Sequence, residues 1–185
     1  MLQKKYIIGI SGHRDLKISE LPKYKKEIKD ILKEKMEEFP DREIYILTPL
    51  AKGADQLIAK VAKELGLRYE VILPMPLELY KKDFTPKEYR EFYTLYIDAV
   101  GATTIELVDD NRLEDIVDYG EKRDKQYLKV GQEVVKRSDF MLFLWDRVVN
   151  HKTGGTADIV EYAKEQYQDN FNKKHHIVEC KRENL

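Results

Sequence analysis

The sequence predicts a Rossmann-like three-layer α/β sandwich with a mostly parallel sheet. Short apolar runs alternate along the chain with longer segments whose apolar residues recur at helical spacing. Because parallel strands need long connections, this alternation favours a parallel sheet with helices on both faces. The chain has 185 residues and shows no internal repeat, so we expect one domain over residues 1–185.

Each element is predicted from its periodicity and its flanking residues. Helices are expected over residues 21–39 and 54–65, where Pro22 fits a first helical turn and Gly66 ends the second helix. Two more helices are expected over residues 125–136 and 157–168. The six apolar runs predicted as strands are residues 6–10, 43–47, 69–73, 103–108, 140–145 and 176–179.

Two segments between these elements are less regular. Pro74 and Pro76 end the third strand, because proline supplies no ladder donor and restricts the residue before it. Residues 74–98 are rich in aromatic side chains, and we interpret them first as a helix packed on the sheet, with a lid or a homodimer surface as alternatives. The acidic segment 109–124 is predicted to be a mobile excursion before the next helix.

Composition narrows the function classes. The chain has 33 basic and 34 acidic residues and a net charge of −1, so it lacks the overall basic field typical of nucleic-acid binding. We therefore expect nucleic acid to be an unlikely partner. Cys180 is the single cysteine, which excludes an internal disulfide and a cysteine-based zinc site and suits a reducing cytoplasm.

The sequence predicts neither a membrane partner nor a metal site. The first residues run directly into a strand, and no apolar run approaches the roughly 20 residues that span a bilayer. We therefore expect an unprocessed cytoplasmic protein. His175 and His176 stand together without a third ligand in view, so we expect no metal and no cofactor.

Two loops at strand ends predict a phosphate-binding site. The glycine loop precedes a helix, whose N-terminal N–H groups and nearby threonine hydroxyl suit an anion. In an open parallel sheet both loops lie at the carboxyl edge, where ligands bind. A nucleotide-like small molecule is therefore the expected ligand. The residues of the two loops are Ser11, Gly12, His13 and Arg14 after the first strand, and Gly154, Gly155 and Thr156 after the fifth.

Individual residues in these loops admit two interpretations. The Arg14 guanidinium can bind a phosphate or carboxylate with two parallel hydrogen bonds, or form a salt bridge with a nearby acid such as Asp15. His13 can contact a base or ribose or act as an acid or base, or it can be a structural hydrogen-bonding residue. Thr156 can offer its hydroxyl to a phosphate or cap the helix that follows.

Three residues outside the two loops complete the predicted site. Gly53 lets the backbone approach a ligand at the same edge of the sheet. Asp55 can bind ribose hydroxyls or cap its own helix. Asp146 closes the fifth strand, where its carboxylate can hold a ribose or order the glycine loop.

Taken together, the motifs resemble those of the SLOG superfamily over roughly residues 5–165. This group joins the phosphoribohydrolases of the LOG type, the DNA-processing protein A family and the YpsA-like nucleotide-sensor domains. The resemblance implies a nucleotide sensor, linked to bacterial stress or defence systems, with a pocket made by the residues named above. The motifs that carry it are Ser11-Gly12-His13-Arg14, Pro49-Leu50-Ala51-Lys52-Gly53-Ala54-Asp55, Leu73-Pro74-Met75-Pro76, Ser138-Asp139, Trp145-Asp146 and Gly154-Gly155-Thr156.

The chain departs from the LOG enzymes at the catalytic position. Their signature is Pro-Gly-Gly-x-Gly-Thr-x-x-Glu, whereas Ile159 occupies the place of the carboxylate here. Two functions follow: a sensor that binds a nucleotide, or an N-glycosidase acting on nucleoside monophosphates, in which Asp158 or Glu161 replaces the missing acid. Of the two, Asp158 is the catalytic candidate, because it stays within the first helical turn. Single-stranded DNA binding is a third, weaker interpretation.

Overall fold

The computed structural model describes residues 4–109, 111–149 and 153–184. The N-terminal residues 1–3, on which part of the prediction of an unprocessed chain rests, lie outside these ranges, as do residues 150–152 in the expected loop before the last helix. Among the described residues, none of the helices combines the length and the apolar character needed to cross a membrane.

The predicted α/β fold with a parallel sheet is confirmed. Six strands form one sheet in the order β4-β3-β2-β1-β5-β6, and every neighbouring pair is parallel. The strands β1 and β5 lie side by side near the middle, with Ser11 opposite Phe143 and Gly12 opposite Leu144. The strands are β1 (Lys4–Gly12), β2 (Arg42–Thr48), β3 (Arg68–Leu73), β4 (Gly101–Thr104), β5 (Phe140–Trp145) and β6 (His175–Glu179).

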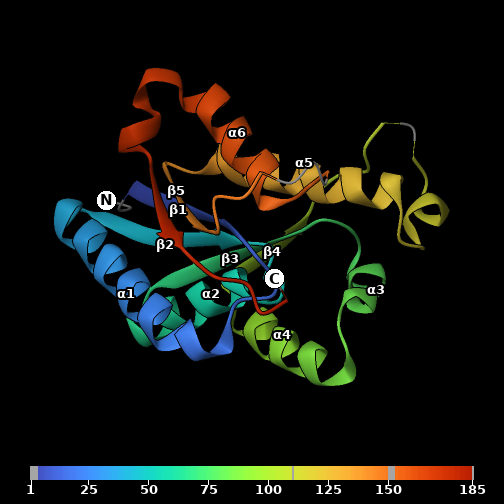
Figure 1. Cartoon of the computed structure of the whole chain (residues 1–185), viewed down its shortest axis with the longest axis horizontal. Helices are drawn as coiled ribbons and strands as arrows, with labels where there is room; N and C mark the ends of the chain where they lie inside the picture. Colours follow the sequence, from blue (N-terminus) through green and yellow to red (C-terminus); the bar gives the residue numbers. More distant parts are fainter. Residues whose placement is uncertain (1–3, 110, 150–152, 185) are drawn as a thin grey trace.

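Helices cover both faces of the sheet, as Figure 1 shows. One layer contains α1, α2 and α4, which pack their apolar sides on one buried cluster of the core. The other layer contains α5 and α6, which enclose a second cluster that includes the fully buried Val134 and Val160. The helices are α1 (Leu21–Glu38), α2 (Ala54–Glu64), α3 (Leu77–Tyr80), α4 (Pro86–Asp98), α5 (Glu121–Arg137) and α6 (Thr156–Tyr167).

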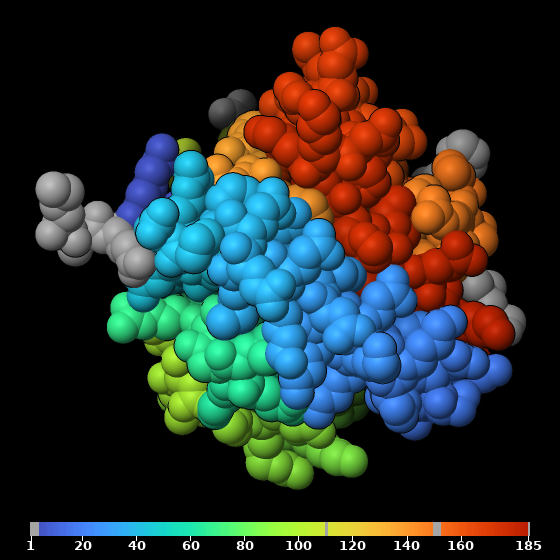
Figure 2. Space-filling view, turned by 90° about the vertical axis from the view of Figure 1, so that its left-hand side faces the viewer, coloured from blue at the N-terminus to red at the C-terminus, as the bar shows by residue number. Residues whose placement is uncertain are grey.

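The first helix is amphipathic along its whole length. Tyr24, Ile28 and Leu32 follow one another at helical spacing and are almost completely buried. In Figure 2 the outer side of α1 lies between the C-terminal segment, coloured red, and the green residues around α2. Helix α1 ends at Glu38, so the end predicted at residue 39 is correct to within one residue.

The aromatic segment after β3 is a packed helix, as first interpreted. Phe92 and Leu95 of α4 are buried against the sheet layer. Thr85 starts the helix with a capping box, because its hydroxyl accepts the Glu88 N–H and the Glu88 carboxylate accepts the Thr85 N–H. The lid and homodimer alternatives for this segment stay predictions.

Two predicted boundaries are wrong. The fourth strand ends at Thr104 instead of residue 108, because the Gln126 side chain pairs with the Glu106 carbonyl and the Val108 N–H and takes the place of a neighbouring strand. Helix α5 begins at Glu121, before the predicted residue 125. Acidic residues favour a helix N-terminus, and Glu121 and Asp124 stand in the first turn of α5.

Candidate functional site

Two adjoining cavities open at the carboxyl ends of the strands, where the sequence predicted a ligand. The smaller one, of about 80 Å³, lies between the end of β1, the loops after β2 and β3, and helices α5 and α6. The larger one, of about 340 Å³, lies between the loop after β1, the start of α5 and the loop before α6. Eight of the ten predicted ligand residues line them: Ser11, Gly12, His13, Arg14, Asp55, Gly154, Gly155 and Thr156.

The loop after β1 is clamped between β5 and the start of α2. The His13 N–H donates to the Leu144 carbonyl at 3.1 Å, and the His13 carbonyl accepts the Ala54 N–H at 3.0 Å. Gly53 has a φ of +86°, and a Cβ there would lie 2.5 Å from the His13 carbonyl oxygen. Gly53 lines neither cavity, so its lack of a side chain serves the approach of two loops to each other rather than to a ligand.

The glycine loop before α6 is held by a carboxylate of its own helix. Gly154 has a φ of +77°, and its N–H donates to Asp158 Oδ2 at 3.0 Å. Gly155 has an ordinary extended conformation and stands at the N-cap position. Thr156 is therefore the first helical residue rather than the cap, and it lines both cavities.

Asp55 repeats this arrangement at the start of α2. Its Oδ2 atom accepts the Ala51 N–H at 3.1 Å, four residues earlier, as Asp158 does from Gly154. The carboxyl group is buried in the wall of the smaller cavity. Burial raises the pKa of Asp55 from 3.8 to about 7, and the contacts with Ala51, Arg14 and Thr48 oppose that rise only in part. Asp55 can therefore hold or release a proton near neutral pH.

Asp146 contacts His13 and not a cavity. The His13 Nε2 atom lies 2.9 Å from Asp146 Oδ1, which also accepts the Val148 N–H at 3.0 Å. Burial opposes the charged carboxylate, but these contacts hold the pKa of Asp146 below its usual value. The pair connects the loops after β1 and β5. These contacts lie at the start of the loop after β5 and do not reach residues 154–156, so the ribose and glycine-loop roles of Asp146 stay predictions. His13 lines the larger cavity.

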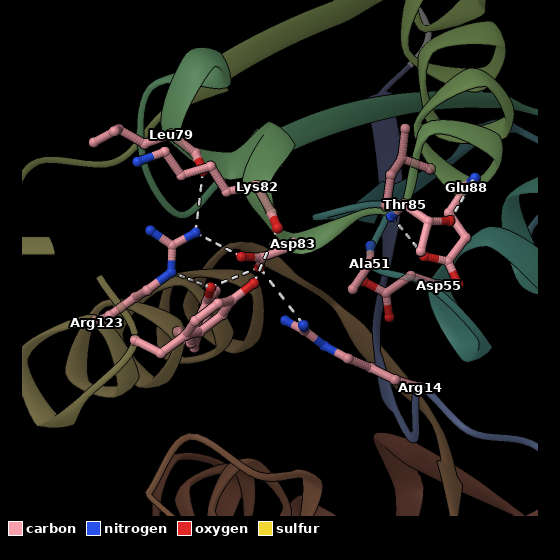
Figure 3. A network of polar contacts seen from close by, with 12 residues as sticks. Arg14, Ala51, Asp55, Leu79, Lys82, Asp83, Thr85, Glu88 and Arg123 are labelled. Atoms are coloured by element: carbon pink, nitrogen blue, oxygen red, sulfur yellow. Dashed lines mark hydrogen bonds and ion pairs between the residues drawn. The ribbon is translucent and has the colours of Figure 1, made fainter. Parts of the chain in front are cut away.

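A buried ionic cluster beside the cavities was not predicted from the sequence. Figure 3 shows Asp83 between the guanidinium groups of Arg14 and Arg123. The side chains of Asp83 and Arg123 are each 1% exposed, and their Oδ1 and Nη2 atoms are 2.5 Å apart. The Tyr127 hydroxyl donates to Asp83 Oδ2 at 2.6 Å. Arg14 Nη1 lies 3.6 Å from the same oxygen, so Arg14 does form the salt bridge predicted as the alternative, but its partner is Asp83, whereas Asp15 pairs with Arg182.

The cluster fixes how Arg14 faces the larger cavity. Its guanidinium carbon lies 5.1 Å from the centre of the Tyr127 ring, and its side chain is 47% exposed. Burial and the Asp83 carboxylate raise the pKa of Tyr127, so this hydroxyl keeps its proton and donates it. Arg14 is thus held by an acid and an aromatic face while its guanidinium stays open to a ligand.

Further residues of the site also come from outside the predicted loops. Tyr80, Tyr119 and Arg182 line the cavities, and Arg182 reaches them from the C-terminal segment through a 2.8 Å contact with Asp15. Nothing in the sequence around these two tyrosines and this arginine indicates that they line a cavity. Among the described residues, no cluster of three or more histidine, cysteine or acidic side chains could hold a metal ion.

Comparison with known proteins shows the fold. No protein-family model matches the sequence, and no curated protein is similar enough to count as a relative. DNA processing protein A from Helicobacter pylori superposes with a TM-score of 0.56 at 14% identity, over 97% of this chain and 67% of that one. The corresponding protein from Streptococcus pneumoniae gives 0.54 at 12% identity, over 94% and 58%. Protein TM1055 gives 0.50 at 13%, over 87% and 69%.

This chain shares its Rossmann-like α/β fold with these proteins. The predicted resemblance to the SLOG superfamily is thereby supported at the level of the fold, and the two cavities lie at the carboxyl edge of this Rossmann-like sheet. The chain spans only 58% of the Streptococcus pneumoniae protein, so the activities of these longer proteins do not transfer to it directly.

The expectation that nucleic acid is an unlikely partner is wrong. The structure of the Helicobacter pylori protein is described as showing a single-stranded DNA binding mode, and that protein shares the fold of this chain. The expectation rested on the net charge of −1 for the whole chain. Net charge says little about one surface, because Arg14 and Arg182 both line the larger cavity of this nearly neutral protein.

The raised pKa of Asp55 predicts a pH-dependent stability. Between about pH 4 and pH 7 the folded protein keeps a proton that the unfolded chain has lost, so the free energy of unfolding falls as the pH rises. Asp55→Asn removes this term and keeps an acceptor for the Ala51 N–H. In urea denaturation, the stability of the wild type relative to Asp55→Asn should fall by up to about 4 kcal/mol across this range. A difference that stays constant or rises contradicts the burial argument.

The Asp83 cluster predicts a large loss of stability on its removal. Asp83→Ala leaves the Arg123 guanidinium buried without its carboxylate, which should lower the free energy of unfolding by about 3–5 kcal/mol. The matched control is Asp30→Ala, which removes an exposed acid paired with Lys26 on α1 and should change stability little. Equal urea midpoints for the two variants would show that the cluster does not stabilise the fold.

Proposed function

We propose that this chain binds a nucleotide or a nucleotide-derived signal in the larger cavity. One observation carries the proposal. Arg14, in the loop after β1, and the glycine loop of residues 154–156, before α6, line the same cavity. A cation and the N-terminus of a helix are the two features that proteins use most often to hold a phosphate. A sensor role in a bacterial stress or defence system is the part of the proposal that rests on the SLOG resemblance.

The phosphate is proposed to lie against the first turn of α6. The N–H groups of a first helical turn have no partner within their helix, and the helix dipole favours an anion there. Gly155 and Thr156 stand at this position, and the Asp158 carboxylate fixes the loop before them. Arg14 faces the same cavity and can bind two phosphate oxygens at once.

The ribose is proposed to reach the neighbouring smaller cavity. Asp55 lines that cavity, which shares Gly12, Arg14 and Thr156 with the larger one. A carboxylate can accept hydrogen bonds from two ribose hydroxyls. Because the pKa of Asp55 is about 7, ribose binding should favour the ionised form and lower that pKa.

Binding without turnover is favoured by the residues at the LOG catalytic position. Ile159 is 2% exposed and packs against Gly131, so no carboxylate stands at its place. Asp158, the candidate substitute, already accepts the Gly154 N–H. Cleavage of an N-glycosidic bond develops positive charge on the ribose, which a nearby carboxylate stabilises.

Single-stranded DNA is the second candidate ligand. The observation that favours it is the SLOG-type fold shared with two DNA processing proteins, one of which is described as binding single-stranded DNA. A DNA strand offers the same phosphate and base chemistry as a mononucleotide. The two candidates differ in size, so a strand must also contact residues outside the cavities.

The phosphate assignment is tested by calorimetry with AMP and adenosine. Arg14→Ala should weaken AMP binding by about 1.5–3 kcal/mol, the range for a hydrogen bond to a charged group, and should affect adenosine less. Gly155→Val should abolish AMP binding without unfolding, because Gly155 has a φ of −76° that valine also adopts. Unchanged affinity in Gly155→Val would place the pocket elsewhere. Binding of an oligothymidylate, but of no mononucleotide, would favour the DNA alternative.

The proposal of binding without turnover is tested by incubation with nucleoside monophosphates. We expect AMP, GMP, CMP and UMP to be recovered intact, because the LOG catalytic position holds Ile159. Chromatography of the free base measures the release. Steady release that disappears in Asp158→Asn would contradict the sensor and establish the hydrolase.

A further inference from the structure

Tyr119 is an exposed aromatic side chain in a fixed position. Tyr119 is 71% exposed, and a side chain with that exposure usually moves freely at the surface. Two contacts hold it instead. Its hydroxyl donates to the Lys82 carbonyl at 3.0 Å, and its ring centre lies 5.2 Å from the guanidinium carbon of the buried Arg123.

The backbone next to Tyr119 is also constrained. Gly120 has a φ of +154°, a conformation that residues with side chains rarely adopt, and it leads directly into α5. Helix α5 follows at once and places the Arg123 guanidinium next to the Tyr119 ring. The hydroxyl end of the Tyr119 ring is fixed by its hydrogen bond to Lys82, and the ring itself by its contact with the Arg123 guanidinium. In this position Tyr119 lines the larger cavity.

We propose that Tyr119 is the platform on which the base of the bound nucleotide stacks. This inference rests on the proposed function, because it needs the phosphate end of the ligand at Arg14 and the glycine loop. Both of these line the same cavity as Tyr119. The ligand is therefore a nucleotide with an intact aromatic base, because a sugar phosphate alone cannot stack on Tyr119.

Size and chemistry agree with this assignment. A cavity of about 340 Å³ lies at the lower end of the range for small-molecule sites, which suits a mononucleotide. Stacking on an aromatic ring accepts any base, because every base has a π face. Tyr119 therefore contributes affinity for any base, and other residues must distinguish one base from another. A ring held in place before binding loses little conformational freedom when the base arrives.

The test compares AMP with ribose 5-phosphate, which lacks the base, by isothermal titration calorimetry of the full chain. Wild type should bind AMP more tightly than ribose 5-phosphate. Tyr119→Ala should weaken AMP binding about tenfold and leave ribose 5-phosphate binding unchanged. Tyr119→Phe keeps the ring and its contact with Arg123 but loses the bond to Lys82, so its affinity for AMP should lie closer to that of wild type than to that of Tyr119→Ala.

The matched control is Tyr93→Ala, which removes another exposed tyrosine, 44% exposed, from α4 and outside both cavities. It should bind both ligands as wild type does. Unchanged AMP affinity in Tyr119→Ala would overturn the stacking inference while leaving the nucleotide proposal intact. Equal weakening of both ligands would also overturn it, because the residue would then act through the structure of the pocket. A wild type that binds neither ligand would instead overturn the proposed function.

Discussion

One buried carboxylate, Asp83, joins the parts of the chain that form the site. It lies after α3 and contacts Arg123 and Tyr127 of α5 as well as Arg14 of the loop after β1. A buried charge is costly unless its partners satisfy it fully, and here two cations and a hydroxyl do so. Arg123 extends the cluster, since it also donates to the Leu79 and Ile116 carbonyls. The irregular segments around the sheet are therefore fixed by polar contacts.

The two ends of the proposed ligand both depend on this cluster. Arg14 is held between Asp83 and the Tyr127 ring, and Tyr119 lies against the other side of the cluster, over Arg123. A nucleotide bound in the larger cavity would thus meet a guanidinium and an aromatic ring whose separation is set before binding. Such preorganisation reduces the entropy cost of binding. The glycine loop completes the site from an independent element, α6.

The sequence allows the sheet and the two loops that line the cavities to be predicted, because their signals are local. Apolar runs mark the strands, and a Gly-Gly-Thr before a helical segment marks the loop at the start of α6 within a few residues. The end of β4 was predicted too late because Gln126, a residue far along the chain, binds the backbone of residues 106 and 108 in place of a neighbouring strand. Gly53 was assigned to a ligand, although its neighbour is the backbone of another loop. Contacts between distant residues leave no trace in a single sequence.

The ionic cluster shows the same limit for charged residues. Asp83 and Arg123 stand among many charged residues, and only their burial together distinguishes them. The error about nucleic acid has a related cause, since a net charge of −1 conceals where Arg14 and Arg182 lie. Residues that act through a shared environment therefore need the structure, whereas residues that act through a local backbone conformation do not.

The central claim is that a nucleotide lies across the larger cavity with its phosphate at α6 and its base at Tyr119. A crystal structure of the protein with AMP tests this most directly. We expect the phosphate against the N–H groups of Gly155 and Thr156, with the Arg14 guanidinium beside it and the adenine ring parallel to Tyr119. A nucleotide bound at any other surface, with this cavity left to solvent, would contradict the account.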